Sequence, residues 1–259
     1  MEDANVFCSP TRRHPIMRAA MLPSNETAVS PRAAIHRADD LRGPAGPLEA
    51  LFTEGAPSAQ YAVVVSHPHP LFGGTMHNKV VYHAAKAFTA AGLPVLRYNF
   101  RGAGRSAGTH DAGRGEAEDL LAAMDWLESA TALPLLLCGF SFGAWVSLRV
   151  ACAHAGRLRG IAALGLPIQA GDRAYSYPFL PGCTMPKLFV GGTRDEFGPV
   201  AQVEAVLATA APPSQVVWVE GADHFFVRPE GPATGLAELQ AALTAWLGAH
   251  FLASAGARA

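Results

Sequence analysis

Hydrophobic residues along the chain fall into short continuous runs separated by amphipathic stretches. The runs are rich in Val, Ile, Leu and Phe and hold few polar residues, which is typical of strands buried on both faces of a sheet. They span 61–66, 94–100, 135–139, 161–166, 188–191 and 215–219. In the other stretches apolar residues recur at steps of three and four, as on one face of a helix. These predicted helices span 78–91, 115–129, 142–153, 200–210 and 233–250. The alternation predicts an α/β fold, a mainly parallel doubly wound sheet with helices on both faces.

Two weaker strand candidates, 33–37 and 47–52, precede this alternation and are separated by a turn-rich segment. We expect them to form an antiparallel pair at one edge of the sheet. Residues 1–30 lack periodicity and mix Pro, Ser, Asn and Arg, which predicts an irregular arm. The sequence thus predicts a single domain over 31–252 and a tail at 253–259. The short segment 167–187 leaves no room for a separate lid domain.

Composition narrows the class of partner. The 20 basic and 21 acidic residues give a net charge of -1, so no long-range field would recruit nucleic acid or an anionic membrane surface. No run approaches the roughly 20 apolar residues of a membrane span, and the N-terminal arginines precede no signal-peptide apolar region. The cysteines show no paired spacing; they are Cys8, Cys138, Cys152 and Cys183. We expect a cytoplasmic protein with reduced thiols, acting on a small molecule.

The strongest chemical signal is the motif Gly-Phe-Ser-Phe-Gly at 139–143. It follows a predicted strand and runs directly into a predicted helix, which is the context of a nucleophile elbow. The turn forces Ser141 outward at a helix N-terminus, where backbone N–H groups favour developing negative charge. A bare motif of this kind is a weak signal in a chain with 26 glycines; the flanking strand and helix make Ser141 the candidate nucleophile.

Serine is a poor nucleophile at its own pKa, so a base and a group that orients the base must follow. In this fold the chain order is serine, acid, histidine. Asp195 follows the strand 188–191 and His224 follows the strand 215–219, so both lie at strand ends in the required order. Asp195 has two rivals. Glu196 is a serious competitor for the acid, whereas Asp223 adjoins His224 in sequence and is interpreted as a loop-shaping carboxylate.

The loop after the strand 61–66 reads His-Pro-His-Pro-Leu-Phe-Gly-Gly. Its position predicts one backbone donor of an oxyanion hole, and Phe142, after the nucleophile, predicts the other. Proline has no N–H, so Leu71 is the preferred loop donor, with Phe72 or His69 as alternatives. Although two histidines stand close together here, no carboxylate or cysteine at ligand spacing completes a shell, and we expect no metal.

A second glycine motif, Gly-Ala-Gly-Arg-Ser-Ala at 102–107, formally resembles a dinucleotide-binding fingerprint. A dinucleotide site requires the helix to begin at these glycines, but the pattern here delays the helix to about residue 115. We interpret this motif as a structural turn and expect no cofactor.

Taken together, these segments resemble the small bacterial α/β hydrolases without a lid, related to the dienelactone-hydrolase and serine-esterase branches. The resemblance covers about 33–250 and rests on the runs HPHPLFGGTMHNKVV, LRYNFRGAGRSAG, GFSFGAW, GGTRDEF and GADHFF. It implies a Ser, Asp and His triad at Ser141, Asp195 and His224. It also implies that Arg101 and Ser106 support the active-site loops without reacting.

The sequence therefore predicts a serine hydrolase that cleaves carboxylic ester or thioester bonds through an acyl-enzyme. The expected pocket is open and suits short acyl chains, with a wall from Phe72, Tyr175, Tyr177 and Phe179, although these aromatics could equally belong to the core. Two alternatives stay open. One is a peptidase or acyltransferase that uses the same triad, and the other is a binding protein on the same scaffold without catalysis.

Overall fold

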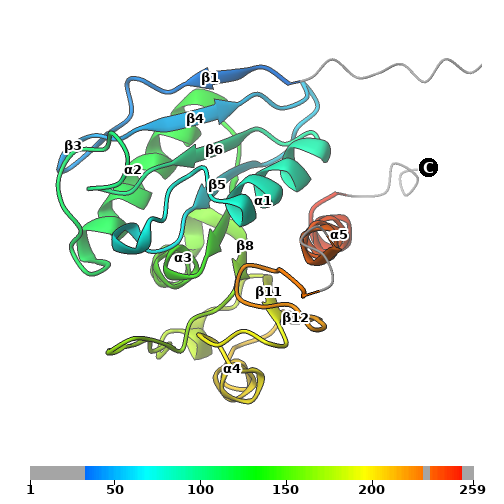
Figure 1. Ribbon diagram of the computed structural model, residues 1–259. Helices are drawn as coiled ribbons and strands as arrows, with labels where there is room; N and C mark the ends of the chain where they lie inside the picture. Colours follow the sequence, from blue (N-terminus) through cyan, green and yellow to red (C-terminus); the bar gives the residue numbers. More distant parts are fainter. Residues whose placement is uncertain (1–32, 230–233, 253–259) are drawn as a thin grey trace, which may run out of the picture. The chain divides into compact units, whose positions relative to one another are not determined.

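The computed structural model describes residues 33–229 and 234–252, so the predicted arm at 1–30, the predicted tail at 253–259 and Cys8 lie outside it. The described residues build a sheet with the strand order β1-β4-β6-β5-β7-β8-β11-β12 (Figure 1). Its strands are β1 (Ile35–Arg37), β4 (Ala50–Thr53), β5 (Ala62–Ser66), β6 (Val95–Tyr98), β7 (Leu135–Phe140), β8 (Leu158–Leu164), β11 (Lys187–Gly192) and β12 (Ser214–Val219).

The sheet is mainly parallel, as predicted. All neighbouring strands from β6 to β12 in this order pair in parallel. At one edge β1 pairs antiparallel with β4, and β4 pairs antiparallel with β6. The expected edge pair is therefore confirmed, but β4 begins at Ala50 and not at 47. The preceding residues instead form a small antiparallel ribbon of β2 (Arg42–Gly43) and β3 (Gly46–Pro47).

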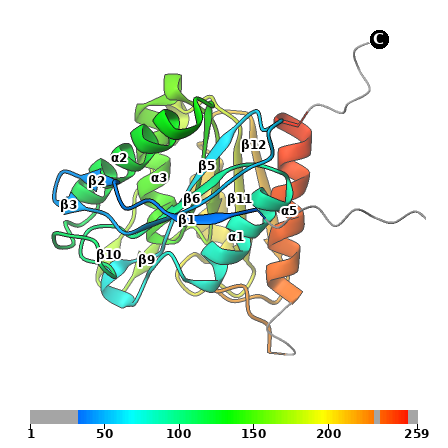
Figure 2. The ribbon, with the colours of Figure 1, turned by 90° about the horizontal axis from the view of Figure 1, so that it is seen from above.

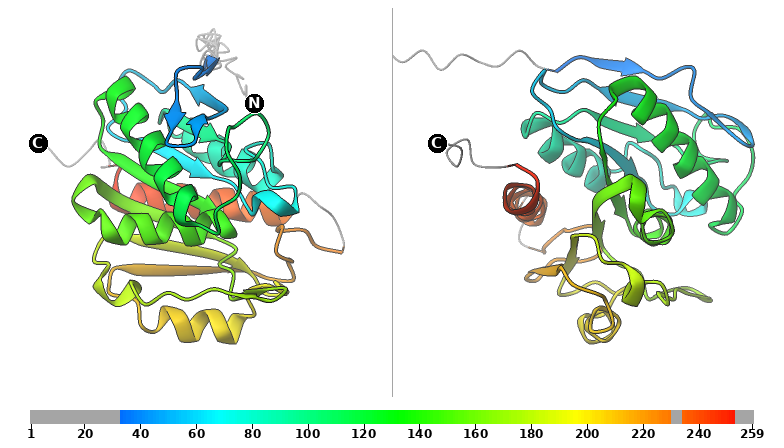
Figure 3. Two further views of the ribbon diagram at one scale, coloured as in Figure 1. Left: turned by 90° about the vertical axis from the view of Figure 1, so that its left-hand side faces the viewer. Right: turned by 180° about the vertical axis from the view of Figure 1, so that it is seen from behind.

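Helices cover both faces of the sheet, as Figures 2 and 3 show. One apolar cluster joins α1 (Lys79–Ala90) and α5 (Thr234–His250) to one face. A second cluster joins α2 (Arg114–Thr131), α3 (Phe142–Ala153) and α4 (Val200–Leu207) to the other face. The strands bury both faces, which explains why their sequences are continuously apolar. None of the helices in 33–229 and 234–252 is both long and apolar enough to cross a membrane.

The segment between β8 and β11 builds no lid. It holds a ribbon of β9 (Gln169–Ala170) and β10 (Arg173–Ala174) and a short turn η3 (Leu180–Gly182). The 3-10 turns η1 (Pro70–Phe72) and η2 (Ala155–Arg157) follow β5 and α3. Of the cysteines, Cys138, Cys152 and Cys183 are free of disulfides.

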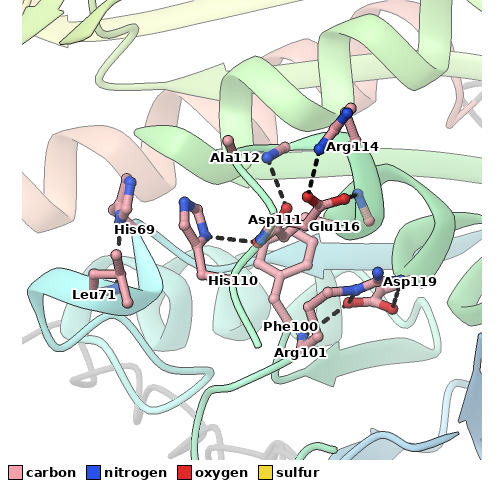
Figure 4. A network of polar contacts seen from close by, with 12 residues as sticks. His69, Leu71, Phe100, Arg101, His110, Asp111, Ala112, Arg114, Glu116 and Asp119 are labelled. Atoms are coloured by element: carbon pink, nitrogen blue, oxygen red, sulfur yellow. Dashed lines mark hydrogen bonds and ion pairs between the residues drawn. The ribbon is translucent and has the colours of Figure 1, made fainter. Parts of the chain in front are cut away.

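The second glycine motif forms a turn, as predicted, and α2 begins after it. Arg101 holds this turn to α2: its backbone N–H and Nε donate to Asp119 Oδ2 over 2.8 and 3.0 Å, and a terminal nitrogen donates to Oδ1 over 2.8 Å (Figure 4). The hydroxyl of Ser106 donates to the Asn99 carbonyl over 2.7 Å and accepts the Glu49 N–H over 2.9 Å. These bonds fix the loop after β6, at the carboxyl ends of the parallel strands, where the candidate site lies.

Candidate active site

The motif at 139–143 forms a strained strand-to-helix turn. β7 ends at Phe140 and α3 begins at Phe142, so Ser141 alone makes the turn. Its backbone lies at φ 56° and ψ -120°, a conformation that costs a non-glycine residue roughly 1–3 kcal/mol. The two glycines make this close approach possible: a Cβ on Gly139 would lie 2.4 Å from the Gly143 carbonyl oxygen, and one on Gly143 would lie 2.4 Å from the His67 carbonyl oxygen.

Ser141, His224 and Asp195 lie in one hydrogen-bonded line. Ser141 Oγ is 2.9 Å from His224 Nε2, and His224 Nδ1 is 2.7 Å from Asp195 Oδ2. The three residues follow β7, β12 and β11, whose carboxyl ends meet at one edge of the sheet. Since they are separated by up to 83 positions in sequence, only the parallel sheet brings them together.

The Asp195 carboxylate is held on both oxygens. Oδ2 faces His224, and Oδ1 accepts the N–H groups of Phe197 over 2.9 Å and Gly198 over 3.1 Å. The carboxylate side chain is 2% exposed. Its rival Glu196 is exposed to solvent. Of the two neighbouring residues, Asp195 is therefore the one that contacts the imidazole.

Asp223 shapes the loop that carries the histidine. Its Oδ1 accepts the N–H of Phe225 over 2.9 Å and that of Val227 over 2.8 Å. Aromatic rings enclose the imidazole: the ring of Phe140 lies 4.9 Å and that of Phe197 lies 4.7 Å from it, measured between centroids. These contacts leave His224 little rotational freedom. A cavity of about 400 Å³ borders its outer side and is lined mainly by polar residues of the two loops.

His67 is a structural histidine and not a free ligand. Its Nε2 accepts the Phe100 N–H over 2.9 Å and its Nδ1 lies 2.6 Å from the Pro68 carbonyl oxygen. The bond from Phe100 places the ring proton on Nδ1, and this neutral imidazole joins the loops after β5 and β6. Burial lowers the pKa of His67 to about 4. Among the described residues, no group of three or more His, Cys, Asp or Glu side chains is arranged to hold a metal.

Because His67 is buried in its neutral form, we expect the free energy of unfolding to fall at acid pH. Its pKa is about 4 in the folded protein and 6.5 as a free side chain, so the unfolded chain binds the extra proton first as pH falls. We expect the free energy of unfolding to drop by about 3 kcal/mol between pH 6.5 and 4 from this residue alone, at 1.36 kcal/mol for each pKa unit. Above pH 6.5 the contribution is complete.

Chemical denaturation at a series of pH values measures this drop. His67→Gln, whose side-chain oxygen can still accept the Phe100 N–H, is expected to flatten the profile between pH 6.5 and 4. The control His154→Gln, at an exposed position, is expected to keep the parent's slope. An equal slope in the parent and in His67→Gln would show that another group governs the acid sensitivity.

The turn η1 uses two of the three loop N–H groups that were candidates for the oxyanion hole. The Leu71 N–H donates to His69 Nδ1 over 3.3 Å and the Phe72 N–H donates to the His69 carbonyl over 3.1 Å. Both side chains lie largely in solvent, 69% and 78% exposed. The His69 N–H has no hydrogen-bond partner among the described residues. The preference for Leu71 therefore does not fit the geometry, because the side chain of His69 accepts that N–H as the N-cap of η1.

The four aromatic residues expected to wall the pocket do not line one surface. Tyr177 is buried in the core, and its hydroxyl donates to the Pro167 carbonyl over 2.5 Å. Tyr175 is also buried, against Trp145, and Phe179 packs against the same core. These three aromatic residues therefore belong to the core, which was the alternative to a pocket wall. Only Phe72 is exposed near the elbow, where its ring lies 4.8 Å from that of His69.

Three polar residues that the sequence analysis did not single out lie beside the elbow. They are His110 and Glu116, from the loop before α2 and its first turn, and Arg173, from β10. Because they come from segments without a motif, no spacing in the sequence connects them with Ser141.

Comparison with known proteins shows the family of the chain. A family model described as "Alpha/beta hydrolase domain" matches residues 60–247, which include the elbow and the loops of Asp195 and His224. The chain belongs to the α/β-hydrolase family. An uncharacterized protein of Rickettsia prowazekii is 35% identical over 192 residues, covering 71% of this hydrolase and 79% of the relative.

Solved structures agree with this assignment. The hydrolase is similar to an alpha-beta serine hydrolase homologue from Coxiella burnetii, with 35% identity, 83% of this chain and 97% of the other covered, and a TM-score of 0.70. It is also similar to an α/β serine hydrolase without a lid from Xanthomonas campestris, with 31% identity, coverage of 84% and 94%, and a TM-score of 0.68. A dienelactone hydrolase from Anabaena variabilis, 18% identical over 83% of this chain and 97% of the other with a TM-score of 0.66, shares the fold.

Proposed function

We propose that this α/β hydrolase cleaves carboxylic ester or thioester bonds of small substrates through an acyl-enzyme on Ser141. The observation that carries the proposal is the hydrogen-bonded line from Ser141 through His224 to Asp195. A hydroxyl with a neutral imidazole in line and a carboxylate behind it is the arrangement that acyl transfer requires.

In this mechanism His224 Nε2 removes the proton of Ser141 as Oγ attacks the carbonyl carbon. Asp195 keeps the imidazole proton on Nδ1 and stabilises the imidazolium that forms. The Phe142 N–H at the start of α3 and a loop N–H stabilise the oxyanion. We assign the loop donor to His69, whose N–H is free of partners among the described residues. The protonated His224 then gives its proton to the leaving oxygen or sulfur as the carbonyl carbon's bond to it breaks. In the second half of the reaction His224 removes a proton from water, which attacks the acyl carbon. The acid leaves as Ser141 Oγ takes the proton back from His224.

The lack of a lid between β8 and β11 supports short acyl groups. Three of the four aromatic residues expected to wall the pocket belong to the core and offer a long acyl chain no surface. A substrate chain beyond a few carbons would therefore extend into solvent and gain little from further methylenes.

A series of p-nitrophenyl esters and the matching thioesters tests this function. We expect measurable hydrolysis of the acetate, with kcat/KM that peaks at acetate to butyrate and does not rise further. A fitted apolar groove would add up to about 0.8 kcal/mol for each methylene, roughly fourfold in rate, so a continued rise toward long chains would contradict the short-acyl proposal. Failure to hydrolyse any ester or thioester would contradict the proposed function.

A further inference from the structure

Three nitrogen-bearing side chains from separate segments gather around the ring of Phe142, next to the nucleophile. Between ring centroids, His69 lies 4.8 Å and His110 lies 5.4 Å from Phe142. The guanidinium carbon of Arg173 lies 5.4 Å from the same ring. The two imidazole rings lie 4.5 Å apart. Nitrogen-bearing side chains are therefore concentrated on one side of the elbow.

His69 presents a ring N–H at this place. Its Nδ1 accepts the Leu71 N–H over 3.3 Å, so the proton of the neutral ring is on Nε2. Burial, followed by the charges of His110 and Arg173, lowers the pKa of His69 to about 4. Figure 4 shows Nε2 on the side of the ring away from Leu71, and Nε2 has no hydrogen-bond partner among the described residues.

A buried carboxylate lies next to His110, which packs against His69. Glu116 is fully buried, and its two oxygens accept the N–H groups of Asp111 over 2.9 Å and Gly113 over 2.7 Å. His110 Nδ1 lies 2.6 Å from Glu116 Oε1. The pair is within ion-pair distance, but Nδ1 is not aligned for a hydrogen bond. The second ring nitrogen of His110 lies on the same side as His69 Nε2 (Figure 4).

Arg173 adds a charge that no carboxylate neutralises among the described residues. One terminal nitrogen donates to the Ala112 carbonyl over 2.8 Å. The central carbon of the guanidinium lies 5.0 Å from the ring centroids of both Trp145 and Tyr175. A guanidinium carries five N–H donors, so a half-buried arginine with one bond inside the protein keeps several for a ligand.

We propose that the Nε2–H of His69 and the guanidinium of Arg173, with His110 packed beside them, form a subsite that binds a carboxylate group of the substrate beside Ser141. A ring N–H and a guanidinium are good donors to a carboxylate. The inference rests on the proposed function, because it concerns the same active site. It narrows the substrate class to small esters or thioesters that carry a carboxylate besides the bond that is cleaved.

Two pairs of esters test the subsite in the parent protein. The half ester of adipic acid with p-nitrophenol is compared with p-nitrophenyl hexanoate, which places the charge on the acyl side. p-Acetoxybenzoate is compared with p-acetoxybenzamide, which places it on the alcohol side. A charge-assisted hydrogen bond predicts about a tenfold or larger preference in kcat/KM for the charged member of at least one pair. Preference for the neutral member in both pairs would overturn the proposal.

Variants of two arginines then show which residue causes the preference for the charged ester. Arg173→Gln is expected to remove most of it, and Arg173→Lys, which keeps the charge, to retain part of it. Arg149→Gln is the matched control, since Arg149 also stacks on Trp145, at 4.6 Å, and also donates to a backbone carbonyl, that of Gly113. The control should keep the parent's ratio.

Loss of the preference in Arg149→Gln to the same extent as in Arg173→Gln would contradict the assignment. So would an unchanged ratio in Arg173→Gln. These outcomes differ from failure of the proposed function, in which no ester of either pair would be hydrolysed.

Discussion

Ser141→Ala is expected to lower kcat for ester hydrolysis by a factor of about ten thousand to a million. The variant loses the oxygen that forms the acyl bond, while His224 and the backbone donors stay in place. Alanine replaces serine without enlarging the strained turn, so the fold should be retained. The rates of parent and variant with p-nitrophenyl acetate, after a check of thermal unfolding, measure the effect.

Ser147→Ala is the control for this substitution. Ser147 lies on α3, the helix that follows Ser141, and is buried, but its hydroxyl donates to Ser66 Oγ over 3.1 Å instead of facing the imidazole. We expect its rate to stay near that of the parent. Parent-like hydrolysis by Ser141→Ala would assign the chemistry to another residue.

Asp195→Asn is expected to lower kcat by a factor of about a thousand to ten thousand. The N–H groups of Phe197 and Gly198 both point at Oδ1, so an amide at this position keeps its oxygen there and turns its NH₂ toward His224. The imidazole must then accept on Nδ1 and carry its proton on Nε2. In this tautomer it cannot take the proton of Ser141.

Glu196→Gln provides the matched control, because it makes the same chemical change at the adjacent, exposed position. It is expected to leave kcat within about twofold of the parent, as surface substitutions usually do. If Glu196→Gln lost activity and Asp195→Asn kept it, the orienting acid would have to be reassigned.

The strands could be predicted because strands buried on both faces are continuously apolar, and the helices because their apolar residues recur on one face. β5, β7 and α3 carry uninterrupted or regularly spaced apolar residues, so their positions follow from local pattern. The nucleophile turn is also local: Gly139 and Gly143 permit contacts that a Cβ would block. Asp195 and His224 could be proposed because parallel strands bring their carboxyl ends to one edge.

Features set by contacts between loops could not be predicted in this way. The use of the Leu71 N–H depends on the His69 side chain, which accepts it as the N-cap of η1. The burial of Tyr177 depends on the Pro167 carbonyl that accepts its hydroxyl. The gathering of His110 and Arg173 around Phe142 joins segments with no common motif. Composition alone does not distinguish an aromatic residue that lines a pocket from one that fills the core.

Covalent labelling with a fluorophosphonate, followed by mass spectrometry of the digested protein, tests the central claim most directly. We expect one phosphonyl group on the peptide that contains Ser141, and a great reduction in labelling rate when His224 is replaced by Ala. A folded protein that remains unlabelled at Ser141, or that is labelled equally fast without His224, would contradict the claim.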